Sequence, residues 1–154
     1  MADMKPLAQL TLAERRLTNR LQLYWQELAR GGLMPSEEDI DPVELEDLWP
    51  KCFLIQTFDI KHRRDMNFTY LGQEIIDAYQ DGVMLEGQNV LVSPQAPKMV
   101  LSFKQVMESM APVVAEGEFL SLAGRIVRYR QCLLPLGKGD SVDAIFGGMS
   151  FKAY

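Results

Sequence analysis

Side chains that commonly carry out chemistry are few in this sequence and are spread along it. His62 is the only histidine, and it lies in a polar stretch between two apolar segments. At such a position a solvated turn residue is commoner than a general base or a metal ligand. Nucleophilic catalysis needs a serine or cysteine beside a base, and His62 gives no convincing base for it. We therefore expect no catalytic residues and no enzymatic activity.

Metal and phosphate sites are not indicated by the spacing of their usual ligands. Cys52 and Cys132 lie far apart, which favours buried, reduced thiols over a zinc site or a disulfide. The acidic cluster within residues 37–47 lacks the ligand spacing of a calcium loop, and a solvated surface explains it more simply. Segment 137–140 lacks the glycine spacing of a phosphate-binding loop. No metal site is expected.

Composition limits the class of protein and of partner. The chain has 154 residues, of which 47% are hydrophobic and 24% charged, enough for one domain with a real core. Its net charge of −5 argues against nucleic acid or an anionic membrane as a partner, because both favour a basic surface. No apolar run is long enough to span a membrane and no export signal is visible, so we expect a cytoplasmic location.

The elements that must position any site begin with residues 125–151. Two long segments rich in β-branched and aromatic residues flank the polar turn 137–140, a pattern typical of a β-hairpin. At 133–134 and 145–146 neighbouring residues are both apolar, so both faces of the sheet should be covered. Further strands are predicted within 52–60, 66–71 and 113–120, and helices within 73–79 and 96–110.

An amphipathic helix is predicted for residues 11–30, because apolar side chains recur there every three or four positions. Its apolar stripe either packs on its own domain or is shared in a homodimer, and the spacing is compatible with both. The later helices can cover only one face of the sheet. We therefore expect this helix to cover the other face, with Trp25 buried against the hairpin. The residues predicted for a partner or dimer interface are Leu17, Leu21, Tyr24, Trp25 and Leu28.

The order of these elements resembles that of a PAS domain. A helix and connector over residues 1–50 precede a domain over residues 51–154, in which two strands are followed by short helices, a longer helix and three strands. Motifs along nearly the whole chain are similar to those of the single-PAS proteins of alphaproteobacteria. They are Tyr24-Trp25, Arg30-Gly31, Pro35, Asp39-x-Asp41-Pro42, Phe68-x-Tyr70-x-Gly72, Gly82 with Gly87, Pro112 and Leu134-Pro135-Leu136. The resemblance implies an α+β fold, with a five-stranded antiparallel sheet, helices on one face and an N-terminal amphipathic helix.

The resemblance also implies a non-enzymatic sensory or regulatory module for bacterial signal transduction, binding a small apolar ligand, a protein partner or both. The ligand pocket would lie between the sheet and the helices, where flexible methionines adapt to a ligand. Residues 72–112 contain no cysteine and no histidine, which argues against a flavin photoadduct and a histidine-ligated haem and leaves the cofactor unknown. The predicted ligand-binding residues are Phe53, Ile55, Phe68, Tyr70, Tyr79, Met84, Leu85, Met99, Phe103, Met107 and Phe146.

Two other functions remain open. An ordinary core explains each predicted ligand-binding residue more simply than a pocket does, since apolar stripes are core more often than pocket. A filled core would leave an adaptor that acts through protein contacts alone. A small α+β barrel enzyme is less favoured, because it needs carboxylates that converge inside the fold. Asp59, Asp65 and Asp143 are the obvious candidates for that role.

Overall fold

The computed structural model describes residues 12–57, 68–83 and 96–153. They contain a five-stranded antiparallel sheet with the strand order β2-β1-β5-β4-β3. The strands are β1 (Cys52–Gln56), β2 (Phe68–Leu71), β3 (Val113–Leu120), β4 (Ile126–Lys138) and β5 (Ser141–Ala153). The helices are α2 (Leu12–Leu28), α4 (Gln73–Gln80) and α5 (Ala96–Ser109), with short 3₁₀ turns η1 (Arg30–Gly32), η2 (Glu37–Asp39) and η3 (Trp49–Lys51) between α2 and β1. The predicted α+β class and five-stranded sheet are confirmed.

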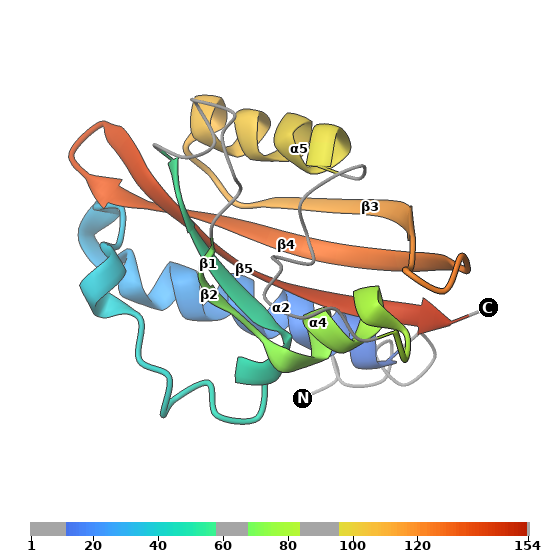
Figure 1. The fold of residues 1–154 in the computed structure, drawn as a ribbon. Coiled ribbons are helices and arrows are strands. Elements are labelled where there is room, and N and C mark those ends of the chain that lie inside the picture. The colour runs from blue at the N-terminus through green and yellow to red at the C-terminus, as the bar shows by residue number, and fades with distance from the viewer. Residues whose placement is uncertain (1–11, 58–67, 84–95, 154) are drawn as a thin grey trace.

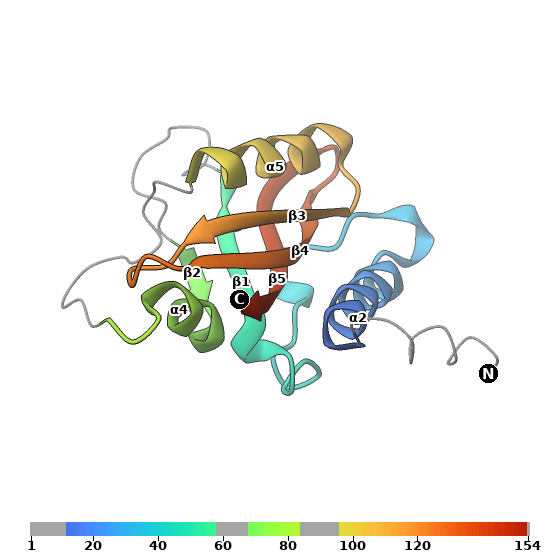
Figure 2. The same ribbon diagram turned by 90° about the vertical axis from the view of Figure 1, so that its right-hand side faces the viewer.

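The sheet has a different helical layer on each of its two faces (Figure 2). We call the face that packs with α4 and α5 the inner face, and the face covered by α2 the outer face. Each face has its own cluster of buried apolar side chains, and strands β1, β4 and β5 contribute to both. This division follows from the alternation of side chains along a strand.

The β4–β5 hairpin forms the long centre of the sheet (Figure 1). Its turn is tighter than the predicted segment, because Gly137 still pairs with Val142 and Lys138 with Ser141. Gly139 has a φ of 69°, a conformation that glycine adopts without steric cost. The hairpin was thus predicted at the correct place, with strands that run further into the turn than expected.

Two adjacent glycines of β5 allow close packing on both faces. A Cβ atom at Gly147 would lie 2.7 Å from Cζ of Phe53 on the inner face. A Cβ atom at Gly148 would lie 2.6 Å from Cδ1 of Leu21 and 3.3 Å from Cδ1 of Leu17 on the outer face. Because neither glycine has a side chain, a phenylalanine ring and a helix approach the same stretch of backbone from opposite sides.

Helix α2 packs its apolar stripe against the sheet of its own chain. Leu17 is 1% exposed and Leu21 is 0% exposed, within the outer-face cluster. Trp25 is half-buried, and its indole Nε1 donates a 2.8 Å hydrogen bond to the carbonyl oxygen of Pro135 on β4. The helix therefore covers the face that the sequence assigns to it.

Candidate functional site

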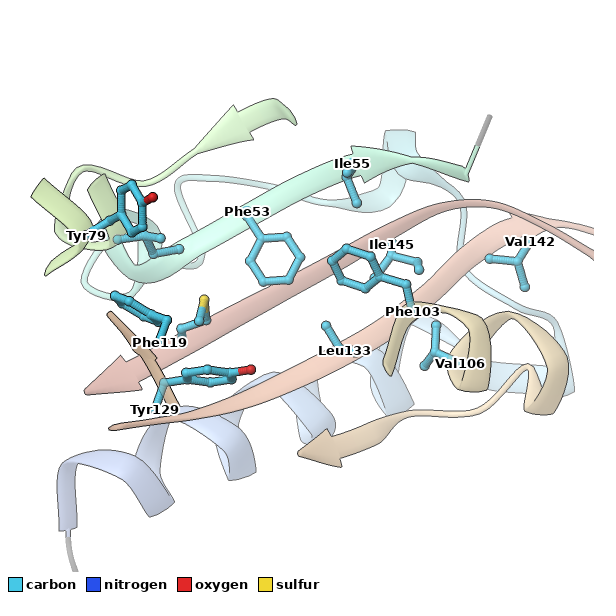
Figure 3. Close-up of a cluster of buried hydrophobic side chains, with 12 residues drawn as sticks. Phe53, Ile55, Tyr79, Phe103, Val106, Phe119, Tyr129, Leu133, Val142 and Ile145 are labelled. Atoms are coloured by element: carbon cyan, nitrogen blue, oxygen red, sulfur yellow. The ribbon is translucent and has the colours of Figure 1, made fainter. Parts of the chain in front are cut away.

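Buried side chains from six elements meet on the inner face and form what we call the inner cluster (Figure 3). Aromatic rings are prominent in it: the ring centroid of Phe53 lies 5.7 Å from that of Phe68. Phe119 lies 5.7 Å from Tyr79 and 5.9 Å from Tyr129. The buried members are Phe53, Ile55, Ile75, Tyr79, Phe103, Val106, Phe119, Tyr129, Leu133, Val142, Ile145 and Met149.

Several of the predicted ligand-binding residues come together in this cluster. Phe53, Ile55, Tyr79 and Phe103 are buried members of it, and Phe68 and Met107 pack against it half-buried. Met84 and Leu85 lie outside the described residues, and of Met99 the structure describes only the backbone position on α5. The six members that meet here come from β1, β2, α4 and α5, so folding brings together segments that are distant in sequence.

Tyr70 and Phe146 do not lie with the others, because both face α2 in the outer-face cluster. Strict alternation places Tyr70 on the same face as Phe68. The pairing of β2 with β1 shifts by one residue between these two positions, however, and such a bulge reverses the side-chain alternation. Phe146 pairs directly with Leu54, another outer-face residue, and paired residues point to the same side.

These two rings instead hold the connector that leads into β1. Tyr70 donates a 2.8 Å hydrogen bond from its hydroxyl to the carbonyl oxygen of Trp49. Its ring stacks on Trp49 with centroids 4.3 Å apart, and Trp49 lies 5.9 Å from the ring of Phe146. They therefore belong to the packing of the outer face and not to the inner cluster.

One polar residue of the inner face was not predicted. Gln131 of β4 is 0% exposed, and neither Nε2 nor Oε1 of its amide has a hydrogen-bond partner in the described part of the chain. It lies between Tyr129 and Leu133, two members of the inner cluster. The sequence does contain a signal, because a glutamine stands where alternation demands a buried apolar residue.

The predicted interface residues lie largely within the chain's own outer-face packing. Leu17 and Leu21 are buried, Tyr24 and Trp25 pack half-buried against the same cluster, and Leu28 is half-buried. The backbone N–H of Asp41 donates a 2.8 Å hydrogen bond to the Tyr24 hydroxyl, which ties the connector to α2. A role of the stripe in a dimer stays a prediction.

With this geometry established, the family model described as "PAS domain" matches residues 13–150. The chain belongs to the PAS domain family. The match includes α2 as well as the sheet, and it places the chain among sensory signalling modules.

Solved structures of similar fold include LOV proteins. The light-state structure of the blue-light photoreceptor Aureochrome1 LOV is 13% identical with a TM-score of 0.48, covering 71% of this chain and 87% of that one. A Rhodobacter sphaeroides LOV protein is 10% identical with a TM-score of 0.45, covering 73% of this chain and 68% of that one. A search of curated proteins finds no match.

An ion pair fixes α4 of the PAS domain at the inner face. Asp81 ends α4 in a left-handed conformation with a φ of 51°. Its carboxylate accepts hydrogen bonds from Arg125 Nε at 2.7 Å and from the Ser121 hydroxyl at 2.8 Å, both in the β3–β4 connection. The hydrogen bond from Arg125, followed by that from Ser121, lowers the pKa of Asp81 to about 2. The charged form of Asp81 therefore holds α4 to the sheet.

The two thiols are free and lie on the outer face. Cys52 of β1 and Cys132 of β4 both pair with Gly148, which lies between them on β5. Burial raises the pKa of each thiol to about 12. Because the thiolate is the reactive form, both groups should react slowly near neutral pH, and the predicted burial of the thiols is confirmed.

An open groove lies at the end of α2, where the chain turns toward the connector. It has a volume of about 390 Å³ and is lined by Trp25, Gln26, Ala29, Gly32, Leu33, Met34, Met110 and Gly139. Most of these residues are apolar or small, so the groove has the character of a contact surface for another apolar group.

Metal ligands and converging carboxylates are not found together in the described part of the chain. Among the described residues, no three His, Cys, Asp or Glu side chains gather to hold a metal ion. Of the three carboxylates that an enzyme would use, Asp143 is exposed, whereas Asp59 and Asp65 lie outside the described residues. None of the helices described is both long and apolar enough to cross a membrane.

Proposed function

We propose that this PAS domain is a non-enzymatic sensory module of bacterial signal transduction, which binds a small, mainly apolar ligand on the inner face. Occupancy of that face is coupled to the packing of α4 and α5, and through them to a protein partner or a second copy of the chain. The net charge of −5 supports a module that binds neither nucleic acid nor an anionic membrane, and we propose that it acts in the cytoplasm.

The observation that carries this proposal is the gathering of predicted ligand-binding side chains from separate elements on one face. Aromatic rings such as those of Phe53 and Phe103 supply contact area for an apolar molecule. Met107 is half-buried beside them, and a methionine side chain adapts to the shape of a ligand. Ligand sites are usually apolar in this way, with a few polar groups that fix orientation.

Native mass spectrometry of the full chain tests the proposal. We expect the protein purified without denaturation to carry a discrete small molecule, which organic extraction releases. Met107→Trp places extra bulk against the inner cluster and should reduce this occupancy. The matched control is Val43→Trp, because Val43 is 76% exposed on the connector. An absence of bound molecule, together with an unchanged melting temperature across a lipid and metabolite library, would contradict the proposal.

A second candidate function is that of an adaptor, and the apolar groove at the end of α2 favours it. Leu33 lines this groove and is 72% exposed. If the groove contacts a protein partner, Leu33→Asp abolishes partner capture, whereas Leu23→Asp on α2, at a site 60% exposed, leaves it intact. Equal effects of the two substitutions would remove the support for this function.

A further inference from the structure

The amide of Gln131 is buried and has no hydrogen-bond partner among the described residues. Four buried side-chain polar atoms lack a hydrogen-bond partner in the described residues, and two of them are the Nε2 and Oε1 atoms of Gln131. The others are Nε of Arg130 and Oγ of Ser150, which pair across β4 and β5 one row from Gln131 and so point to the opposite face. Gln131 thus combines an unmet donor and an unmet acceptor.

The amide projects from the inner face. Along β4, Tyr129 and Leu133 flank Gln131 at two-residue spacing, and both belong to the inner cluster. On the adjacent strand β5, Gln131 pairs with Met149, which is also a member of the inner cluster. Residues two apart on a strand, and residues paired directly across strands, point to the same side of a sheet.

The residues next to Gln131 on the neighbouring strand β3 are small. On β3 the paired residue is Ala115, and the next inner-facing position of that strand is Gly117. The Tyr129 ring leans across to β3, because a Cβ atom at Gly117 would lie 2.5 Å from the Tyr129 hydroxyl oxygen. Small residues on β3 and a flexible methionine on β5 are therefore neighbours of Gln131, and the ring of Tyr129 is directed over β3.

We propose that Gln131 is the polar anchor of the ligand site, and that it selects a neutral ligand carrying a hydrogen-bond donor beside an acceptor on an apolar body. This inference rests on the proposed function. A glutamine amide presents a donor and an acceptor in one plane, which matches the edge of a lactam, another cis amide or a protonated carboxylic acid. None of the buried side chains in the described part of the chain is an Asp, Glu, Lys or Arg, so a charged ligand would be buried without a buried counter-ion.

The free protein gives a first test that needs no ligand. Removing an unsatisfied buried amide removes its desolvation penalty, so Gln131→Leu should raise the melting temperature of the ligand-free protein. Gln56→Leu is the matched control, because the amide of Gln56 donates hydrogen bonds to Glu37 at 3.1 Å and to Thr69 at 3.3 Å. It should leave the melting temperature unchanged or lower it. A lower melting temperature for Gln131→Leu would overturn the inference, because the amide would then have a partner in the free protein.

Binding of three matched compounds gives the second test, with affinities measured by calorimetry at pH 7. They are 2-quinolinone, which has the donor and acceptor edge, its N-methyl derivative, which lacks the donor, and naphthalene, which lacks both. The wild-type protein and Gln56→Leu should bind 2-quinolinone about tenfold more tightly than the N-methyl derivative, a difference of the size of a buried hydrogen bond. Gln131→Leu should lose this preference and keep the wild-type affinity for naphthalene.

The outcomes separate the two proposals. Binding of naphthalene and both quinolinones by the wild-type protein without preference, or a preference that survives in Gln131→Leu, would overturn the role of Gln131 and leave the apolar site standing. If none of the three compounds binds and native mass spectrometry shows no bound molecule, the proposed function fails and the role of Gln131 fails with it.

Discussion

The outer and inner faces of the sheet are both covered by helices, but the contacts differ in kind. On the outer face, leucines of α2 lie directly over Gly148, and the indole of Trp25 is hydrogen-bonded to β4. The inner face carries a cluster of aromatic and aliphatic side chains from several elements, and the amide of Gln131 on the same face has no partner in the described residues. Stability alone explains the first arrangement. It does not explain the second, because an unpaired buried amide lowers stability.

The largest effect is expected for Leu21→Ala on the outer face. Leu21 is 0% exposed and lies over Gly148, so the substitution opens a cavity that the helix backbone cannot fill. We expect a loss of about 3 kcal/mol in the free energy of unfolding, measured by urea denaturation. Leu23→Ala, at a position 60% exposed, serves as the control and should change the free energy of unfolding by less than about 0.5 kcal/mol. Similar losses for the two variants would mean that α2 does not close the outer face.

Trp25→Ala should have a smaller effect at the same face. The side chain is half-buried and makes one hydrogen bond to Pro135, so both apolar contact and a backbone partner are lost. The expected cost is about 2 kcal/mol. Trp25→Phe keeps much of the contact and removes the N–H donor, so it should cost about 1 kcal/mol. If the two variants were equally stable, the hydrogen bond would account for the whole effect.

Local patterns predicted the backbone well. The β4–β5 hairpin was predicted from two apolar segments around a glycine turn, and α2 from its apolar stripe, because these signals lie within a short stretch of sequence. Their position on the sheet also followed, since a sheet with two apolar faces needs a cover on each.

The assignment of side chains to faces was less predictable. Tyr70 was placed with Phe68 because strict alternation was assumed, and the bulge that separates them depends on pairing with β1. For Phe146, the choice of face depends on the register with Leu54. The sequence could not predict that the amide of Gln131 lacks a partner among the described residues, because such a partner could have come from any segment of the chain.

Acid should weaken the two faces unequally, through one Asp–Arg pair on each. Asp81 pairs with Arg125 beside the inner face, and its pKa is lowered to about 2 from 3.8. Asp47 pairs with Arg20 of α2 beside the outer face, and its pKa is also lowered by this hydrogen bond. A carboxylate with a lowered folded-state pKa stabilises the protein fully above its unfolded-state pKa, and the contribution is lost as the pH falls toward the folded-state value.

For Asp81 this window runs from about pH 4 down to about pH 2. Asp81→Asn is chosen because asparagine tolerates the left-handed conformation. Between pH 5 and pH 2.5, the urea midpoint of this variant should fall less than that of the wild-type protein. Asp47→Asn is the matched variant on the outer face. We expect Asp81→Asn to reduce the acid dependence more, because its carboxylate has two partners, Arg125 and Ser121. An acid dependence identical to wild type in Asp81→Asn would exclude the ion pair as a source of stability.

The smallest effect is expected from thiol reagents, and it tests whether the outer face stays closed. Cys52 and Cys132 are both 0% exposed beneath α2. Burial raises the pKa of each thiol to about 12, so very little of the reactive thiolate is present at pH 8. Labelling with a disulfide reagent should be negligible in the native protein and complete in urea, as followed by absorbance. Fast labelling of the native protein would show that α2 leaves the sheet readily. Slow labelling that accelerates on dilution would instead indicate that a second copy of the chain helps to close this face.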